Sequence, residues 1–130
     1  LDTMHAGGLC GMATFLDPSI TTADNLSGQV VARKGDLPEV HDSVSINVHL
    51  MSHMVAGDGA SPEKIQPLRN NEMLMLNVAT ATSVGVTRNA EKTKTDLDLR
   101  LPICADKGQR ISLSRRVGSR WRLIGYGTIV

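Results

Sequence analysis

The stretch Ser43-Val44-Ser45-Ile46-Asn47-Val48-His49-Leu50 alternates polar and apolar side chains from end to end. Successive side chains of a β-strand point to opposite faces of the sheet, so this alternation predicts a strand with one buried and one wet face. The same period of two recurs in 96–101 and 110–114. No stretch convincingly repeats apolar residues three and four positions apart, which a long amphipathic helix would require. The chain is therefore predicted to be β almost throughout.

The remaining strand and turn signals indicate how these strands are assembled. Met73-Leu74-Met75-Leu76 is continuously apolar, which is typical of a strand covered on both faces. Turn-forming pairs occur at short intervals, at Asp58-Gly59, Asn70-Asn71 and Lys107-Gly108. Many short strands with turns between them are typical of a sandwich or barrel. We expect an all-β fold built around an antiparallel β-barrel.

The first part of the chain is expected to belong to a different domain. Residues 1–37 contain two strand candidates, Leu9–Phe15 and Gln29–Arg33. Two strands cannot bury a core by themselves, so this segment should be the C-terminal end of another domain. The boundary is expected near Gly35–Pro38, which leaves 38–130 as a complete domain.

Composition excludes several classes of protein. The 130 residues carry a formal net charge of +1, and 41% of them are hydrophobic, as in ordinary globular domains. No run is apolar enough to span a membrane. The start at Leu1, without Met, suggests a fragment, and Cys10 and Cys104 are expected to be buried, reduced thiols. Phe15, Trp121 and Tyr126 are the only aromatic residues, so the core should be aliphatic.

Positive charge is concentrated in the C-terminal half. Residues 64–130 hold twelve basic and five acidic residues, against two and eight in residues 1–63. Six cations occur within residues 107–122 without a carboxylate among them: Lys107, Arg110, Arg115, Arg116, Arg120 and Arg122. A guanidinium matches phosphate bidentately, so this cluster is a candidate RNA- or partner-binding site on a strand–turn–strand tip. Pairing of these arginines with carboxylates of neighbouring domains is an equally open interpretation.

Other candidate sites have simpler interpretations. His49 and His53 are four residues apart, which could hold zinc on a helix, but on a strand this spacing separates them by about 13 Å. Two solvated histidines and no metal site are therefore expected. Trp121 should plug one end of the barrel. No serine lies in a nucleophile elbow, and no catalytic residue is predicted.

The end of the chain holds the long motif Ser112-Leu113-Ser114-Arg115-Arg116-Val117-Gly118-Ser119-Arg120-Trp121-Arg122-Leu123-Ile124-Gly125-Tyr126-Gly127. Shorter motifs precede it: Gly7-Gly8-Leu9, Leu16-Asp17-Pro18, Gly28-Gln29-Val30-Val31, Leu37-Pro38, Glu72-Met73-Leu74-Met75-Leu76-Asn77-Val78 and Pro102-Ile103-Cys104-Ala105. In this order they closely resemble the C-terminal part of the gamma subunit of translation initiation factor 2, a translational GTPase of the elongation factor Tu class. The archaeal form is the nearer match, and the resemblance covers essentially the whole chain.

The resemblance implies a GTP-binding domain followed by two β-barrels, with 1–37 ending the second barrel and 38–130 forming the third. It implies a cytoplasmic factor that binds GTP and Mg²⁺ and assembles with alpha and beta subunits. Such a factor delivers initiator methionyl-tRNA to the small ribosomal subunit. Gly7, Gly8 and Leu9 match a part that lies near the aminoacyl end of tRNA in related factors.

This chain contains no GxxxxGK[ST] phosphate loop, so we expect it to be a binding and scaffolding module without a GTPase site or cofactor of its own. Two alternatives stay open. One is the C-terminal barrel of another translational GTPase, such as a selenocysteine-specific elongation factor. The other is a free-standing barrel that binds RNA or protein.

Overall fold

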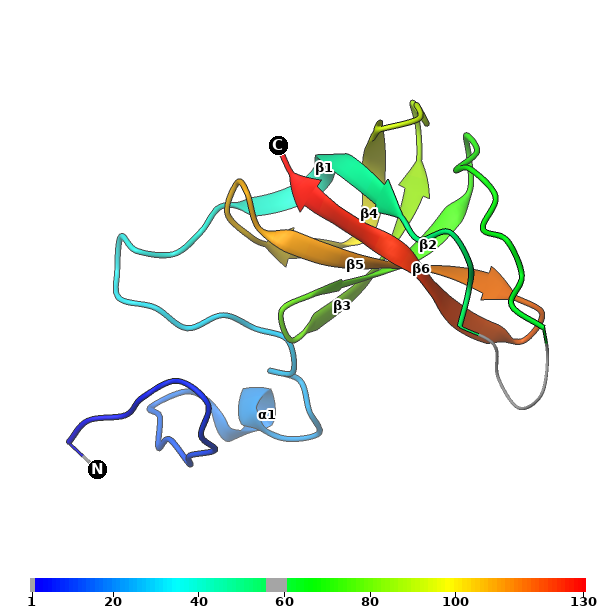
Figure 1. The fold of residues 1–130 in the computed structure, drawn as a ribbon. Coiled ribbons are helices and arrows are strands. Elements are labelled where there is room, and N and C mark those ends of the chain that lie inside the picture. Colours follow the sequence, from blue (N-terminus) through cyan, green and yellow to red (C-terminus); the bar gives the residue numbers. More distant parts are fainter. Residues whose placement is uncertain (1, 56–60) are drawn as a thin grey trace.

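Six antiparallel strands close into a barrel in the computed structural model, which describes residues 2–55 and 61–130. The strands are β1 (Val40–Leu50), β2 (Met73–Val78), β3 (Ala81–Thr87), β4 (Lys94–Cys104), β5 (Arg110–Val117) and β6 (Arg120–Ile129). Around the barrel they follow the order β1-β4-β3-β2-β5-β6, and β6 pairs back onto β1 (Figure 1). The predicted all-β, antiparallel barrel is confirmed.

The apolar residues of the barrel core are all aliphatic, as the scarcity of aromatic residues predicted. Four polar residues of the described chain are buried as well: Ser83, Thr87, Thr95 and Ser114. On β1, the alternation quoted above places Val44, Ile46 and Val48 inside, each at most 6% exposed. Their polar neighbours on β1 face outward or lie at intermediate depth. The buried apolar residues are Val44, Ile46, Val48, Ile65, Leu74, Leu76, Val78, Leu97, Ile103, Ala105, Ile111, Leu113, Ile124 and Ile129.

Two predicted turns connect these strands. Asn70-Asn71 turns into β2 with Asn71 at φ 60°, and Lys107-Gly108 joins β4 to β5 with Gly108 at φ 83°. Asparagine and glycine are the residues that adopt such left-handed conformations at low cost. The predicted turn Asp58-Gly59 lies outside the described residues.

Two strands depart from their predicted burial. In β2, Leu74 is buried but Met73 is 42% exposed, so the expectation that this strand is covered on both faces was wrong for the described residues. In β4, Leu97 is buried whereas Leu101 is 62% exposed. Pairing between β1 and β4 jumps from Ser43↔Asp98 to His41↔Ile103. The extra β4 residues in this irregularity rotate Leu101 out of the buried face.

Gly125 and Gly127 allow β6 to approach β1 closely enough to close the barrel. A Cβ at Gly125 would lie 2.2 Å from the carbonyl oxygen of His49 and 2.9 Å from Cα of Leu50. A Cβ at Gly127 would lie 2.7 Å from Cδ1 of Ile46. Glycine at these positions is therefore required by the approach of a neighbouring backbone and a core side chain.

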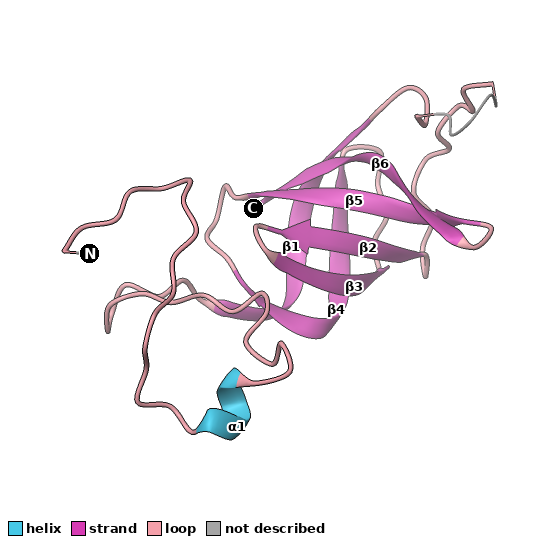
Figure 2. Ribbon diagram, turned by 90° about the horizontal axis from the view of Figure 1, so that it is seen from below, coloured by secondary structure: helices cyan, strands magenta, loops and turns pink. Residues whose placement is uncertain are grey.

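Residues 2–39 form an arm beside the barrel, with one short helix, α1 (Pro18–Thr21) (Figure 2). The predicted strands Leu9–Phe15 and Gln29–Arg33 do not form, because no neighbouring strand hydrogen-bonds to them within the described part of the chain. Nearly every arm residue is exposed. Gly28 is an exception, and a Cβ there would lie 3.0 Å from Cα of Ala81, at the start of β3. Across 2–55 and 61–130, no helix is long and apolar enough to cross a membrane.

Candidate functional site

The structure divides the predicted basic cluster between the two ends of β5. Lys107 lies in the turn before β5, and Arg110 is the first residue of β5. Arg110 and Arg116 are six residues apart on the strand, which separates them by about 20 Å. Figure 1 shows the two ends of β5 on opposite sides of the barrel. The β5–β6 hairpin carries the other four cations: Arg115, Arg116, Arg120 and Arg122. The expectation that all six cations lie on one strand–turn–strand tip was therefore wrong for Lys107 and Arg110.

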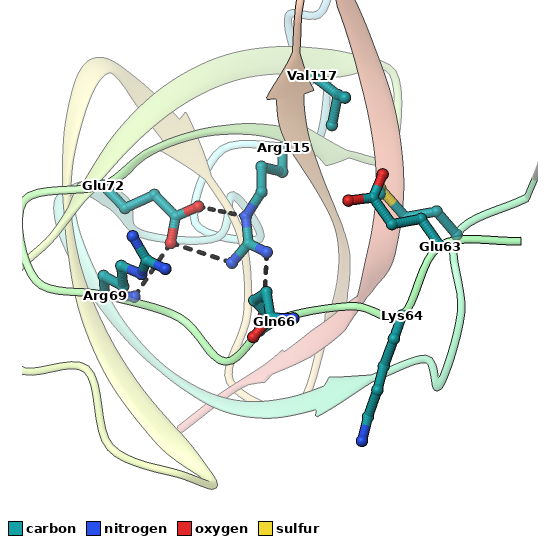
Figure 3. Close-up of a pocket in the computed structure, with 8 residues that line it drawn as sticks. Glu63, Lys64, Gln66, Arg69, Glu72, Arg115 and Val117 are labelled. Atoms are coloured by element: carbon teal, nitrogen blue, oxygen red, sulfur yellow. Dashed lines mark hydrogen bonds and ion pairs between the residues drawn. The ribbon is translucent and has the colours of Figure 1, made fainter.

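Arg115 is held inside one end of the barrel by the connection between β1 and β2. Its guanidinium forms a bidentate ion pair with the carboxylate of Glu72. It also donates hydrogen bonds to the backbone carbonyls of Gln66 and Pro67, at 3.0 and 3.2 Å. Figure 3 shows the contacts of Arg115 with Glu72 and Gln66 at the opening of the barrel. Both charged side chains are only 17% exposed. We call this arrangement of Arg115, Glu72, Gln66 and Pro67 the arginine clamp.

Sequence reasoning placed Arg115 just before a turn at Val117-Gly118, whereas β5 continues to Val117 and Arg115 keeps the parity of the buried Ile111 and Leu113. Pairing between β5 and β6 shifts between Leu113 and Ser114, where Ile124 is the extra residue on β6. Beyond the shift, Arg115 pairs with the buried Leu74 of β2. The partner Glu72 is 43 positions away in sequence, and no short motif links the two residues.

A pocket of about 330 Å³ adjoins the arginine clamp. Its lining mixes both signs of charge with apolar groups: Met54, Glu63, Lys64, Gln66, Arg69, Glu72, Arg115 and Val117. In Figure 3 the Lys64 side chain extends away from Arg115. None of its described lining residues is a serine, cysteine or histidine. No group of three metal-ligating side chains occurs in residues 2–55 and 61–130.

The remaining cations of the hairpin are more accessible. Arg116 and Arg120 are exposed, and Nε of Arg116 donates to the carbonyl of Gly118 at 3.3 Å. Arg122 is half-buried and lies opposite Arg115, while Trp121 is half-buried and lies opposite Arg116. Trp121 is absent from the buried core, so it does not plug the barrel as expected. Arg116 and Arg120 thus keep the character expected of a basic tip.

At the other end of β5, Arg110 takes part in a stack of planar groups. Its guanidinium carbon lies 5.0 Å from the centre of the Tyr126 ring. The ring of His49 stacks on Tyr126 with 4.9 Å between centroids and 22° between planes. Sequence reasoning treated His49, Tyr126 and Arg110 separately because they belong to three different strands. Their alignment follows from the register in which β6 pairs with β1 and β5.

The other residues singled out in the sequence are spread over the molecule. Gly7, Gly8 and Leu9 are exposed in the arm. His53 lies in an isolated bridge with Lys64, away from the His49 stack. Cys10 is exposed, so the expectation that it is buried was wrong; it lies on the arm, whose predicted strands do not form. Cys104 is half-buried and its thiol donates to the carbonyl of Pro38 at 3.2 Å.

A polar depression of about 530 Å³ lies over β1 and β4 and contains the two aspartates of the outer face. Asp98 pairs with Arg88. Asp96 accepts hydrogen bonds from the Ser45 hydroxyl at 2.5 Å and from the Asn89 amide at 3.0 Å. These hydrogen bonds, with that of Ser45 the stronger cause, lower the pKa of Asp96 below its ordinary value. Asp96 is therefore a solvated, ionised carboxylate, which a general acid at neutral pH could not be.

Ser45→Ala is expected to raise the pKa of Asp96 toward its ordinary value, because the hydrogen bond that most favours the ionised form is lost. A lowered pKa means that Asp96 stabilises the fold at pH values above its ordinary pKa. That contribution disappears as pH falls through the folded-state pKa. Carboxyl-carbon NMR titration measures the shift. Ser43→Ala, in the same depression, is the control. An equal shift in both variants would contradict the assignment.

Comparison with known proteins gives a consistent match. The family model described as "Initiation factor eIF2 gamma, C terminal" matches residues 42–129. "Translation initiation factor 2 subunit gamma" of Methanococcus aeolicus is 51% identical over 125 residues, covering 96% of this chain and 30% of its own length. The proteins of the same name from Methanothermobacter thermautotrophicus and Pyrococcus horikoshii are 48% and 42% identical over 130 residues. This chain covers 31% of each of these two. It thus spans under a third of the length of these relatives.

Proposed function

The chain belongs to the family of the C-terminal domain of initiation factor eIF2 gamma, and from this we propose that it is the C-terminal barrel region of a translation initiation factor 2 gamma subunit. The observation that carries the proposal is the family match, which spans the barrel from β1 to β6. The whole factor would be a cytoplasmic protein that works with alpha and beta subunits. It would bring initiator methionyl-tRNA to the small ribosomal subunit in a GTP-dependent way.

Within that factor, this chain acts as a scaffold and has no catalytic centre of its own. The sequence has no GxxxxGK[ST] loop, so GTP and Mg²⁺ would be held by another part of the factor. Residues 1–37 would complete a second barrel, and 38–130 would be the third. The many exposed apolar residues of the arm support this division, since Phe15 and Leu9 have no covering partner within the described chain. Gly7, Gly8 and Leu9 would then lie near the aminoacyl end of the tRNA.

The cations of the chain have distinct proposed roles. Arg115 anchors the connection before β2, because its donors are taken up within the barrel. Arg116 and Arg120, together with the half-buried Arg122, would meet ribosomal RNA or another domain at the hairpin tip. Lys107 and Arg110 would act at the opposite end of β5.

The test is to exchange the aligned region of the Methanococcus aeolicus factor for this chain. The hybrid, assembled with its alpha and beta subunits, is expected to bind initiator methionyl-tRNA in the presence of GTP. Its affinity should lie within a factor of about two to three of the parent, because substitutions away from a site rarely change a free energy by more than about 0.5 kcal/mol. Filter binding with GTP and with GDP measures it.

A second hybrid with the corresponding region of a selenocysteine-specific elongation factor is the control, and it should bind initiator tRNA poorly. A folded first hybrid that fails to bind would refute the proposed function. Equal binding by both hybrids would show that this region does not distinguish the two factors, which would leave the alternative assignment standing.

A further inference from the structure

The outer surface of β1, β6 and β5 carries a face on which every side chain has a hydrogen-bond donor. Two cross-strand rows run across these strands, in registers given by the pairing of β6 with both neighbours. Every member is exposed or half-buried, whereas Val48 and Ile111, which lie between them on β1 and β5, are buried in the core. We call this the donor face; its rows are Asn47–Thr128–Arg110 and His49–Tyr126–Ser112.

The donor face differs from the rest of the barrel in its chemistry. It has an amide, two hydroxyls, a phenol, an imidazole and a guanidinium, and it has no carboxylate. The adjoining strand β4, which pairs with β1, carries Asp96 and Asp98. An anionic ligand would therefore meet donors on β1, β6 and β5, and carboxylates on the adjoining strand β4.

Arg110 is the charged centre of this face and is held ready to bind. Its guanidinium rests on Tyr126, which is itself stacked on His49, so the long side chain is already ordered. Within residues 2–55 and 61–130, the Arg110 side chain donates no hydrogen bond and forms no ion pair. Arg115 and Arg88, in contrast, are paired with Glu72 and Asp98. Ordering a cation before it binds lowers the entropy that binding must overcome.

We propose that the donor face binds the sugar–phosphate backbone of RNA, with Arg110 on a phosphate and the amide and hydroxyl groups on neighbouring phosphate and ribose oxygens. Contacts to nucleic-acid backbones come largely from arginine, lysine, serine, threonine, asparagine and tyrosine, which describes this face closely. The core of a protein interface is richer in apolar groups, and none of the six residues is aliphatic. The inference rests on the proposed function, which supplies the RNA setting, and it assigns the contact to the barrel wall as well as the tip.

Binding of the 130-residue chain to fluorescein-labelled oligouridylate of about 12 nucleotides, a length that one small barrel can cover, tests the proposal. Fluorescence anisotropy is measured across a series of salt concentrations. Arg110→Gln should weaken binding roughly tenfold, because a charge-assisted contact is lost. It should also lower the log–log salt slope by about 0.7, because one fewer counterion is released from the single strand.

Tyr126→Leu separates the role of the stack from that of the charge. It should weaken binding about two- to fivefold, because the support under Arg110 is lost. The salt slope should stay unchanged, since the charge remains. Arg100→Gln, at an exposed arginine of β4 outside the donor face, removes the same charge and should have no effect. Circular dichroism of each variant checks that the barrel is intact.

Wild-type affinity and slope in both Arg110→Gln and Tyr126→Leu would overturn the proposal. So would equal weakening in Arg100→Gln, because binding would then depend on net charge alone. If the chain binds a labelled polyglutamate peptide but no oligouridylate, the face recognises acidic protein and the RNA assignment is wrong. None of these results affects the hybrid factor, whose tRNA binding tests the proposed function separately.

Discussion

Gly125→Ala is expected to lower the free energy of unfolding by about 3 kcal/mol or more, at the upper end of the usual cost of overpacking. The added Cβ would lie 2.2 Å from the carbonyl oxygen of His49, and both atoms belong to rigid backbone. Neither can rotate away, so β6 must separate from β1 and the barrel must open at that seam. In a domain of this size such a loss lowers the melting temperature by roughly 10–20 °C.

Gly127→Ala is the matched control on the same strand. Its nearest contact would be Cδ1 of Ile46 at 2.7 Å, which is the flexible end of a side chain, so a change of rotamer relieves part of the clash. We expect it to be clearly less destabilising than Gly125→Ala. Urea unfolding followed by circular dichroism gives both values. A loss below about 1 kcal/mol for Gly125→Ala, or the reverse order of the two variants, would contradict the role assigned to this seam.

Arg115→Ala is expected to destabilise the barrel by about 2–3 kcal/mol, because the arginine clamp is lost and Glu72 stays behind, only 17% exposed and without its cation. The carbonyls of Gln66 and Pro67 lose their donors in the same step. The connection before β2 should then loosen, and faster amide exchange around Gln66 and Arg69 would report it.

Arg116→Ala removes the neighbouring charge from the exposed side of the hairpin and should change stability by no more than about 0.5 kcal/mol. The pair of variants therefore separates an internal role from a surface role at adjacent positions. If both variants lost the same stability, or neither lost any, the clamp would not be what holds this end of the barrel closed. Glu72→Gln should have an effect in the same direction as Arg115→Ala, since a neutral amide cannot replace the carboxylate.

The strands could be predicted from the sequence where pairing is regular. In β1, the alternation from Ser43 to Leu50 gives the correct buried set because no bulge interrupts it. In β4 the same reasoning fails at Leu101. There an irregularity in the β1–β4 ladder shifts the side chains of one strand relative to the other. A bulge depends on the partner strand, so a single strand's pattern carries little sign of it.

The candidate sites show a related limit. Six cations within sixteen positions suggested one cluster, but an extended strand places its two ends about 20 Å apart, so nearness in sequence did not give nearness in space. The converse holds for the donor face, where His49, Arg110 and Tyr126 come from three strands and meet through register. The arm was predicted as strands from its apolar residues, but a strand needs a neighbour to form.

Because the barrel core contains no aromatic side chain, aromatic absorption and fluorescence report little on the core. Tyr126 lies on the outer wall, Trp121 beside the hairpin tip and Phe15 on the exposed arm, so no aromatic ring absorbs or emits from the core. Tryptophan emission therefore reports the β5–β6 hairpin and not the barrel as a whole. Where the hairpin frays before the barrel melts, an emission curve and a backbone dichroism curve will separate. That separation arises from the position of one indole and does not require a folding intermediate.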